Sequence, residues 1–136
     1  METSVLRIAG AAVVAALGFV ASSLDAEYRI LFGIIAGIPS LALMFLSRRQ
    51  LGASFSVRPE ARALVTTGLY ARIRHPMYVF LDILLLSIIV VSGWKLLLVI
   101  WGALVVVQII QASREEKVLA ARFGDVYAAY TRRTWF

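Results

Sequence analysis

Two polar stretches hold the residues most capable of chemistry. The first is Arg-His-Pro-Met-Tyr at residues 74–78, which contains the only histidine of the chain. The second begins with the adjacent carboxylates Glu115 and Glu116. Imidazole, phenol and carboxylate groups accept or donate protons, and carboxylates also pair with ammonium groups. These residue types therefore predict either proton transfer or the binding of a charged ligand.

Helical spacing arranges these residues in two polar stripes. The first stripe consists of His75, Tyr78 and Asp82, and the second of Gln108, Gln111 and Glu115. Positions i, i+3 and i+7 share one face of a helix. If the two helices are antiparallel, Asp82 lies level with Gln108 and Gln111, about 10 Å deeper than His75 at 1.5 Å per residue. The stripes predict a polar substrate cavity that opens towards the cytoplasm and includes Asp82, Gln108 and Gln111.

The elements that position these stripes are apolar helices. The chain has 136 residues, 61% of them hydrophobic, and a mean hydropathy of +0.85. A soluble domain has roughly 45–50% apolar residues. Four segments approach the length of a membrane span: 8–24, 30–46, 77–92 and 96–112. We predict a single all-α domain, a polytopic membrane bundle of four transmembrane helices.

The connections also carry structural signals. Gly33 and Gly37 have a spacing that allows close helix contact, and Pro39 predicts a kink. Residues 93–95 predict a tight turn with Trp94 at the membrane interface. After the last span, residues 114–133 have the pattern of an amphipathic helix on the membrane surface, where Tyr127 and Tyr130 would be interface anchors.

Charge placement predicts the orientation. The formal net charge is +6, and basic residues concentrate in the loop 48–76 and in the C-terminal tail. The positive-inside rule places such segments, and hence both chain termini, in the cytoplasm. This placement favours contact with lipid headgroups over nucleic acid. The sequence has no cysteine and no paired zinc histidines, so we expect no metal site.

Together, the polar stretches resemble the isoprenylcysteine carboxyl methyltransferase and phospholipid methyltransferase family. The resemblance covers about residues 48–130. Its motifs are Gly-x-Tyr at 68–70, Arg-His-Pro-x-Tyr at 74–78, Glu-Glu at 115–116 and Phe-Gly-x-x-Tyr at 123–127. Residues 51–56 also resemble the segment that precedes the motif.

The resemblance implies an integral membrane enzyme that transfers a methyl group from S-adenosylmethionine to a lipid or lipidated acceptor. It implies a cofactor site composed of Tyr70, His75, Pro76, Tyr78, Glu115 and Glu116. It also places Arg74 near the acceptor or the donor's carboxylate, so we expect the catalytic residues to be Arg74, Glu115 and Glu116. Phe80 stands where the family usually has glycine, which predicts a different pocket wall.

Several alternatives stay open from the sequence. The acceptor is a carboxylate, as in isoprenylcysteine, an amine, as in a phospholipid, or another group. The sequence does not choose which glutamate, if any, acts as a base. A small multidrug-type transporter that uses Asp82 and a nicotinamide-dependent membrane reductase are the alternative functions, and a homodimer is an open alternative to a monomer.

Overall fold

The computed structural model is an all-helical bundle, and it describes residues 2–52 and 64–135. Its long elements are α1 (Glu2–Ala21), α2 (Ala26–Phe32), α3 (Ile38–Leu51), α4 (Pro76–Ser92) and α5 (Leu97–Thr131). A π-helical turn (Gly33–Gly37) joins α2 to α3, and a 3-10 turn (Gly68–Ala71) precedes α4. The basic positions Arg58 and Arg62, and most of the motif-like segment 51–56, lie outside the described residues.

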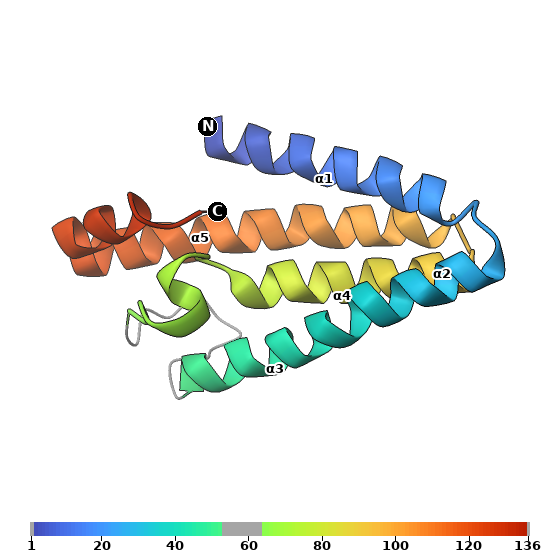
Figure 1. Cartoon of the computed structure of the whole chain (residues 1–136). Helices are drawn as coiled ribbons and strands as arrows, with labels where there is room; N and C mark the ends of the chain where they lie inside the picture. Colours follow the sequence, from blue (N-terminus) through green and yellow to red (C-terminus); the bar gives the residue numbers. More distant parts are fainter. Residues whose placement is uncertain (1, 53–63, 136) are drawn as a thin grey trace.

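Helix α4 is the centre of the bundle (Figure 1). It contacts α1, α2, α3, α5 and the π-helical turn. The buried core of the α1, α4 and α5 side is formed by Ile89, Trp101 and Val105, with Ala11 and Ala15 packed against them. The two polar stripes predicted from the sequence therefore belong to neighbouring helices, α4 and α5.

The second apolar segment is one continuous helical run with an irregular turn. The π-helical turn Gly33–Gly37 ends just before Pro39, whose missing N–H removes one bond of the helical ladder. Gly37 faces Ser87 of α4, so a Cβ there would lie 3.2 Å from the Ser87 Cβ. The close helix contact predicted from the Gly33 and Gly37 spacing is confirmed.

Two helical stretches are long and apolar enough to cross a membrane, Ala26–Leu51 and Leu97–Thr131. Val5–Ala21 and Pro76–Ser92 are apolar but shorter. Large apolar side chains cover the outside of the bundle; for example, Leu17 and Ile35 are 63% and 65% exposed. Such a surface is typical of lipid contact, which agrees with a membrane location.

The turns at the ends of α4 and α5 depend on two glycines. Gly93 ends α4 at φ 72°, and the chain reverses into α5 at Leu97, as the Gly-Trp-Lys turn predicts. The expected helix over 114–133 is not a separate element, because α5 continues without a break to Phe123. Gly124, at φ 47° and ψ −122°, then interrupts it, and the last turns fold back along α5 (Figure 1).

Candidate active site

The segment that leads into α4 is held at both of its sides. The backbone N–H of Leu69 donates to Gln50 Oε1 at the end of α3, at 2.8 Å. The Tyr130 hydroxyl donates to the Tyr70 carbonyl oxygen at 2.7 Å. These bonds fix the 3-10 turn between α3 and the end of α5, so the residues that follow it have a defined position.

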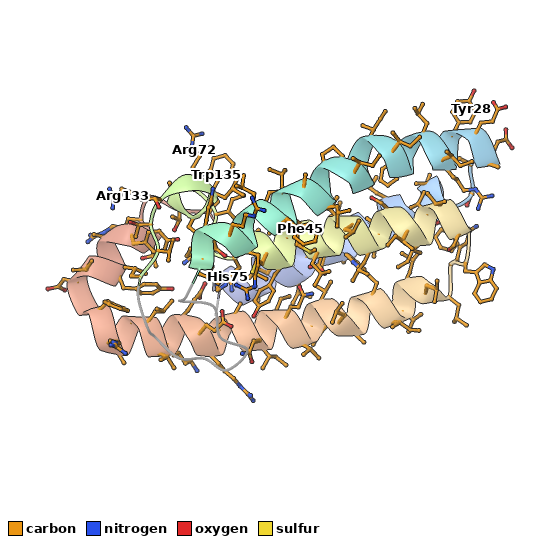
Figure 2. All side chains as sticks on the ribbon, turned by 90° about the horizontal axis from the view of Figure 1, so that it is seen from below. Tyr28, Phe45, Arg72, His75, Arg133 and Trp135 are labelled. Carbon is orange, nitrogen blue, oxygen red and sulfur yellow. The ribbon has the colours of Figure 1, made fainter. Side chains whose placement is uncertain are left out.

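The C-terminal tail pairs with the same segment. The Trp135 N–H donates to the Arg72 carbonyl oxygen at 2.6 Å, and the Arg74 N–H donates to the Trp135 carbonyl oxygen at 3.2 Å. Ile73 and Trp135 thus form an isolated parallel bridge. Figure 2 shows Arg72, His75, Arg133 and Trp135 at one end of the bundle, with Tyr28 at the other.

His75 is the residue immediately before α4, and Pro76 is the buried first residue of the helix. Proline suits this place because the first N–H of a helix has no intrahelical partner. The His75 ring stacks on the Tyr78 ring, with 5.6 Å between centroids and 14° between planes. Both side chains face α5, where His75 contacts Glu116 and Tyr78 contacts Glu115.

Glu116 is the centre of a group of nitrogen-bearing side chains, two arginines and a histidine. Its Oε1 lies 2.6 Å from Arg7 Nη2, 3.2 Å from His75 Nε2 and 3.7 Å from Arg74 Nη1. The carboxylate thus joins α1, the segment before α4 and α5. Arg7 carries no functional signal in the sequence, because only its position beside an apolar helix is visible there.

The ionisation of Glu116 is fixed by these neighbours. Burial alone would raise its pKa, but the hydrogen bonds from His75 and Arg7 and the charges of Arg7 and Arg74 lower it to about 2. Glu116 lies beyond the apolar part of α5, which ends near Ala112. At neutral pH it is a carboxylate with its hydrogen-bonding capacity engaged, which makes it a poor general base.

Glu115 has a different set of partners. Its Oε1 accepts from the Tyr78 hydroxyl at 2.9 Å and from Gln111 Nε2 at 3.4 Å. Its Oε2 lies 3.6 Å from His75 Nδ1. These partners of Glu115 are a phenol, an amide and an imidazole, whereas Glu116 contacts two arginines. Glu115 is therefore the glutamate with charge left for a cationic ligand group.

Tyr127 and Tyr130 cover this cluster and are not the interface anchors expected from their spacing. They are 6% and 4% exposed, with 6.1 Å between ring centroids. Burial raises the pKa of each to about 12, so both stay protonated. The chain reversal at Gly124 is the physical reason, because it turns the last helical residues from the surface onto the site.

A cavity of about 320 Å³ begins at this cluster and continues between α1, α4 and α5. The end of the cavity next to the two glutamates, here called the upper wall, includes Arg7, His75 and Tyr78. The end towards the middle of α4 and α5, the deeper wall, includes Asp82, Trp101 and Gln108. The polar side chains around the upper wall are called the upper cluster. The remaining lining is mostly apolar: Gly10, Ala11, Val14, Val79, Ile83, Val105, Ile109 and Ala112. The lining is typical of a small-molecule or lipid site, apolar with a few placed polar groups.

The deeper wall contains polar atoms without partners. Asp82 Oδ1 and both amide atoms of Gln108 are buried and make no hydrogen bond of good geometry within residues 2–52 and 64–135, although the Gln108 amide lies near enough to act on the Asp82 carboxyl group. Gln108 is 8% exposed. Leaving a buried polar group unpaired costs about 1–3 kcal/mol. These atoms are therefore suited to bind a polar group that enters the cavity.

The structure brings most of the predicted site residues together. Tyr70, Arg74, His75, Pro76, Tyr78, Glu115 and Glu116 lie around the upper cluster, and Asp82 and Gln108 line the cavity. Gln111 differs, since its amide is directed at Glu115. Phe80 is buried at 9% exposure and does not belong to the lining of the cavity.

Comparison with known families identifies the family of the chain. The model of the family described as phospholipid methyltransferase matches residues 28–126, more than half of the chain. The chain belongs to the phospholipid methyltransferase family. Neither a curated protein nor a solved structure gives a match. The family match includes Tyr70, Arg74, His75, Pro76, Tyr78, Glu115 and Glu116, but not Arg7, Tyr127 or Tyr130. Membership supports a membrane methyltransferase that acts on lipids.

Proposed function

We propose that this protein is an integral membrane enzyme that transfers a methyl group from S-adenosylmethionine to a lipid acceptor. The observation that carries the proposal is the continuity of two sites. Arg7, His75 and Tyr78, which contact the two glutamates, line one end of a largely apolar cavity, in a chain of a methyltransferase family. The arrangement favours this function over a transporter or a reductase.

The upper cluster fits the amino-acid part of S-adenosylmethionine, which carries an ammonium and a carboxylate. We assign the ammonium to Glu115, because Glu116 is already engaged by two arginines. Arg74 is placed to pair with a carboxylate. Tyr70, His75, Pro76 and Tyr78 complete the proposed cofactor site. The bound donor supplies an electrophilic methyl group on a sulfonium, so the protein chiefly provides alignment and excludes water.

The cavity fits the reacting group of the acceptor. The Asp82 carboxylate oxygen without a partner can accept a hydrogen bond from a donor on the acceptor. The charge of the Asp82 carboxylate would repel an acceptor carboxylate. We therefore propose an amine headgroup as the acceptor. An amine must lose a proton before it can attack, and Asp82 Oδ1 is the proposed recipient of that proton. Gln108 would orient the headgroup through its free amide.

We propose four membrane spans, made by α1, the α2–α3 run, α4 and the apolar part of α5. The 17 residues of α4 extend about 25 Å at 1.5 Å per residue, close to the thickness of about 30 Å of the hydrocarbon core. The polar cluster then lies at the same side as Arg48 and Arg49 at the end of α3 and Arg72 and Arg74 before α4. By the positive-inside rule, that side and both chain termini face the cytoplasm.

Calorimetric titration of detergent-purified protein with S-adenosylhomocysteine tests the donor assignment. We expect saturable binding that is lost in Glu115→Ala and His75→Ala. Glu27→Ala, an exposed acidic position in α2 at the far end of the bundle, is the matched control and should bind normally. A folded wild-type protein without affinity for S-adenosylhomocysteine would refute the proposed function.

Transfer of a labelled methyl group tests the acceptor. We expect product with phosphatidylethanolamine vesicles and none with a prenylated cysteine. Asp82→Asn should abolish transfer while S-adenosylhomocysteine binding persists, and the exposed Asp25→Asn should retain both. Transfer to the prenylated cysteine in preference to the amine would show that the amine assignment is wrong.

A further inference from the structure

A second hollow lies along the contact between α1 and α5. It has a volume of about 350 Å³, and we call it the outer groove; its lining is Ile8, Val106, Ile109, Ile110, Ser113, Arg114 and Lys117. Ile109 also lines the cavity described above. The α1–α5 contact is thus a wall with a hollow on each side, and the outer groove belongs to the side away from the polar cluster.

The polarity of the outer groove changes along its length. Val106 and Ile110 are about half exposed, and Ser113, Arg114 and Lys117 follow on the same stripe of α5. Positions separated by three or four residues lie above one another on a helix. The stripe from Val106 to Lys117 covers eleven steps, or about 16 Å. Over that distance the lining changes from apolar side chains to the Ser113 hydroxyl and then to the cations Arg114 and Lys117.

The cations of the outer groove make no polar contact with the residues that the structure describes. Neither Arg114 nor Lys117 makes a side-chain hydrogen bond or an ion pair within the described part of the chain. On α1 the situation is reversed, because Arg7 points to the other side of the wall and pairs with Glu116. Arg114 and Lys117 are therefore available for an anion outside the protein.

We propose that the outer groove binds a phospholipid with an anionic headgroup from the surrounding bilayer. An acyl chain lies against Ile8, Val106 and Ile110, and the phosphate lies between Arg114 and Lys117. Charge complementarity decides the occupant, since an apolar surface on one of the proposed spans, with Arg114 and Lys117 at its polar end, matches a negatively charged lipid. This site is independent of methyl transfer. Its occupant would pack on the wall that carries the Arg7–Glu116 bond.

Native mass spectrometry of the full-length protein in detergent tests the proposal. The probes are dioleoylphosphatidylglycerol, which is anionic, and dioleoylphosphatidylcholine, which is zwitterionic with the same acyl chains. We expect the wild type to retain the anionic lipid preferentially. A cation near the membrane surface contributes about fivefold in affinity. Arg114→Gln combined with Lys117→Gln should therefore weaken phosphatidylglycerol binding by about 25-fold.

A matched variant separates this site from general surface charge. Arg132→Gln combined with Arg133→Gln removes two cations from the exposed tail and should leave phosphatidylglycerol binding unchanged. Val106→Trp should fill the apolar part of the groove and reduce binding of both lipids. Equal losses in the two double variants would overturn the proposal. So would a lipid-free dimer of the wild type that the Arg114 and Lys117 substitutions dissociate, because a second copy would then occupy the groove.

Discussion

Arg7 and Glu116 are 109 positions apart in the chain, yet Arg7 Nη2 lies 2.6 Å from Glu116 Oε1. Their side chains are 10% and 20% exposed. The bond joins α1, which precedes the family match, to the carboxylate pair within it. Because Glu116 also contacts His75, the first helix takes part in positioning the proposed donor site.

Arg7→Gln should destabilise the protein and weaken the proposed donor site. A hydrogen bond to a charged group contributes about 1.5–3 kcal/mol to stability. We expect a loss of about this size in a denaturation titration in micelles, together with reduced affinity for S-adenosylhomocysteine. Arg132→Gln, which removes an exposed arginine from the tail, is the control. Unchanged stability and affinity in Arg7→Gln would show that the bond has no such role.

The two adjacent glutamates should respond differently to the same substitution. Glu115→Gln removes a charge held by the Tyr78 hydroxyl and the Gln111 amide, so it should abolish S-adenosylhomocysteine binding with little change in stability. Glu116→Gln removes the common partner of Arg7 and Arg74, so it should lower the melting temperature. Identical behaviour of the two variants in both assays would contradict the separate roles.

The low pKa of Glu116 predicts a defined pH dependence. A carboxyl group with an ordinary pKa of 4.5 unfolded and about 2 folded stabilises the folded state above pH 4.5. That stability is lost as the pH falls towards 2. The free energy of unfolding of the wild type should exceed that of Glu116→Gln by about 1–3 kcal/mol at pH 7. This difference should become smaller as the pH falls from 4.5 to 2. A stability difference that does not vary over this pH interval would show that the folded state does not favour the ionised form of Glu116.

Local patterns in the sequence predict much of this architecture. The apolar segments become helices, Gly33 and Gly37 pack on α4, and the i, i+3, i+7 stripes bring His75 and Asp82 to one cavity. These features depend on residues close in sequence. The contact of Arg7 with Glu116 could not be predicted in this way, because the two residues belong to helices far apart in sequence. A single arginine beside an apolar run also has no periodic signal.

The reversal at Gly124 is the other feature that local pattern does not provide. The spacing of Tyr127 and Tyr130 indicates an amphipathic helix, but it does not say which surface the helix covers. The backbone conformation of Gly124 decides which surface the helix covers. At φ 47° and ψ −122°, Gly124 directs both tyrosines onto the segment before α4, where Tyr130 bonds the Tyr70 carbonyl.

Gly124→Ala should therefore open the site without a steric clash. A Cβ at this position would meet no atom within 4 Å, so the cost is conformational, of order 1–3 kcal/mol for a non-glycine residue in a sparsely populated region. We expect faster proteolysis of the tail and weaker S-adenosylhomocysteine binding. Gly102→Ala is the matched control, because Gly102 is helical and equally open. That substitution should add about 1 kcal/mol of stability. If both alanine variants bind and resist proteolysis equally well, the positive φ of Gly124 does not hold the tyrosines over the site.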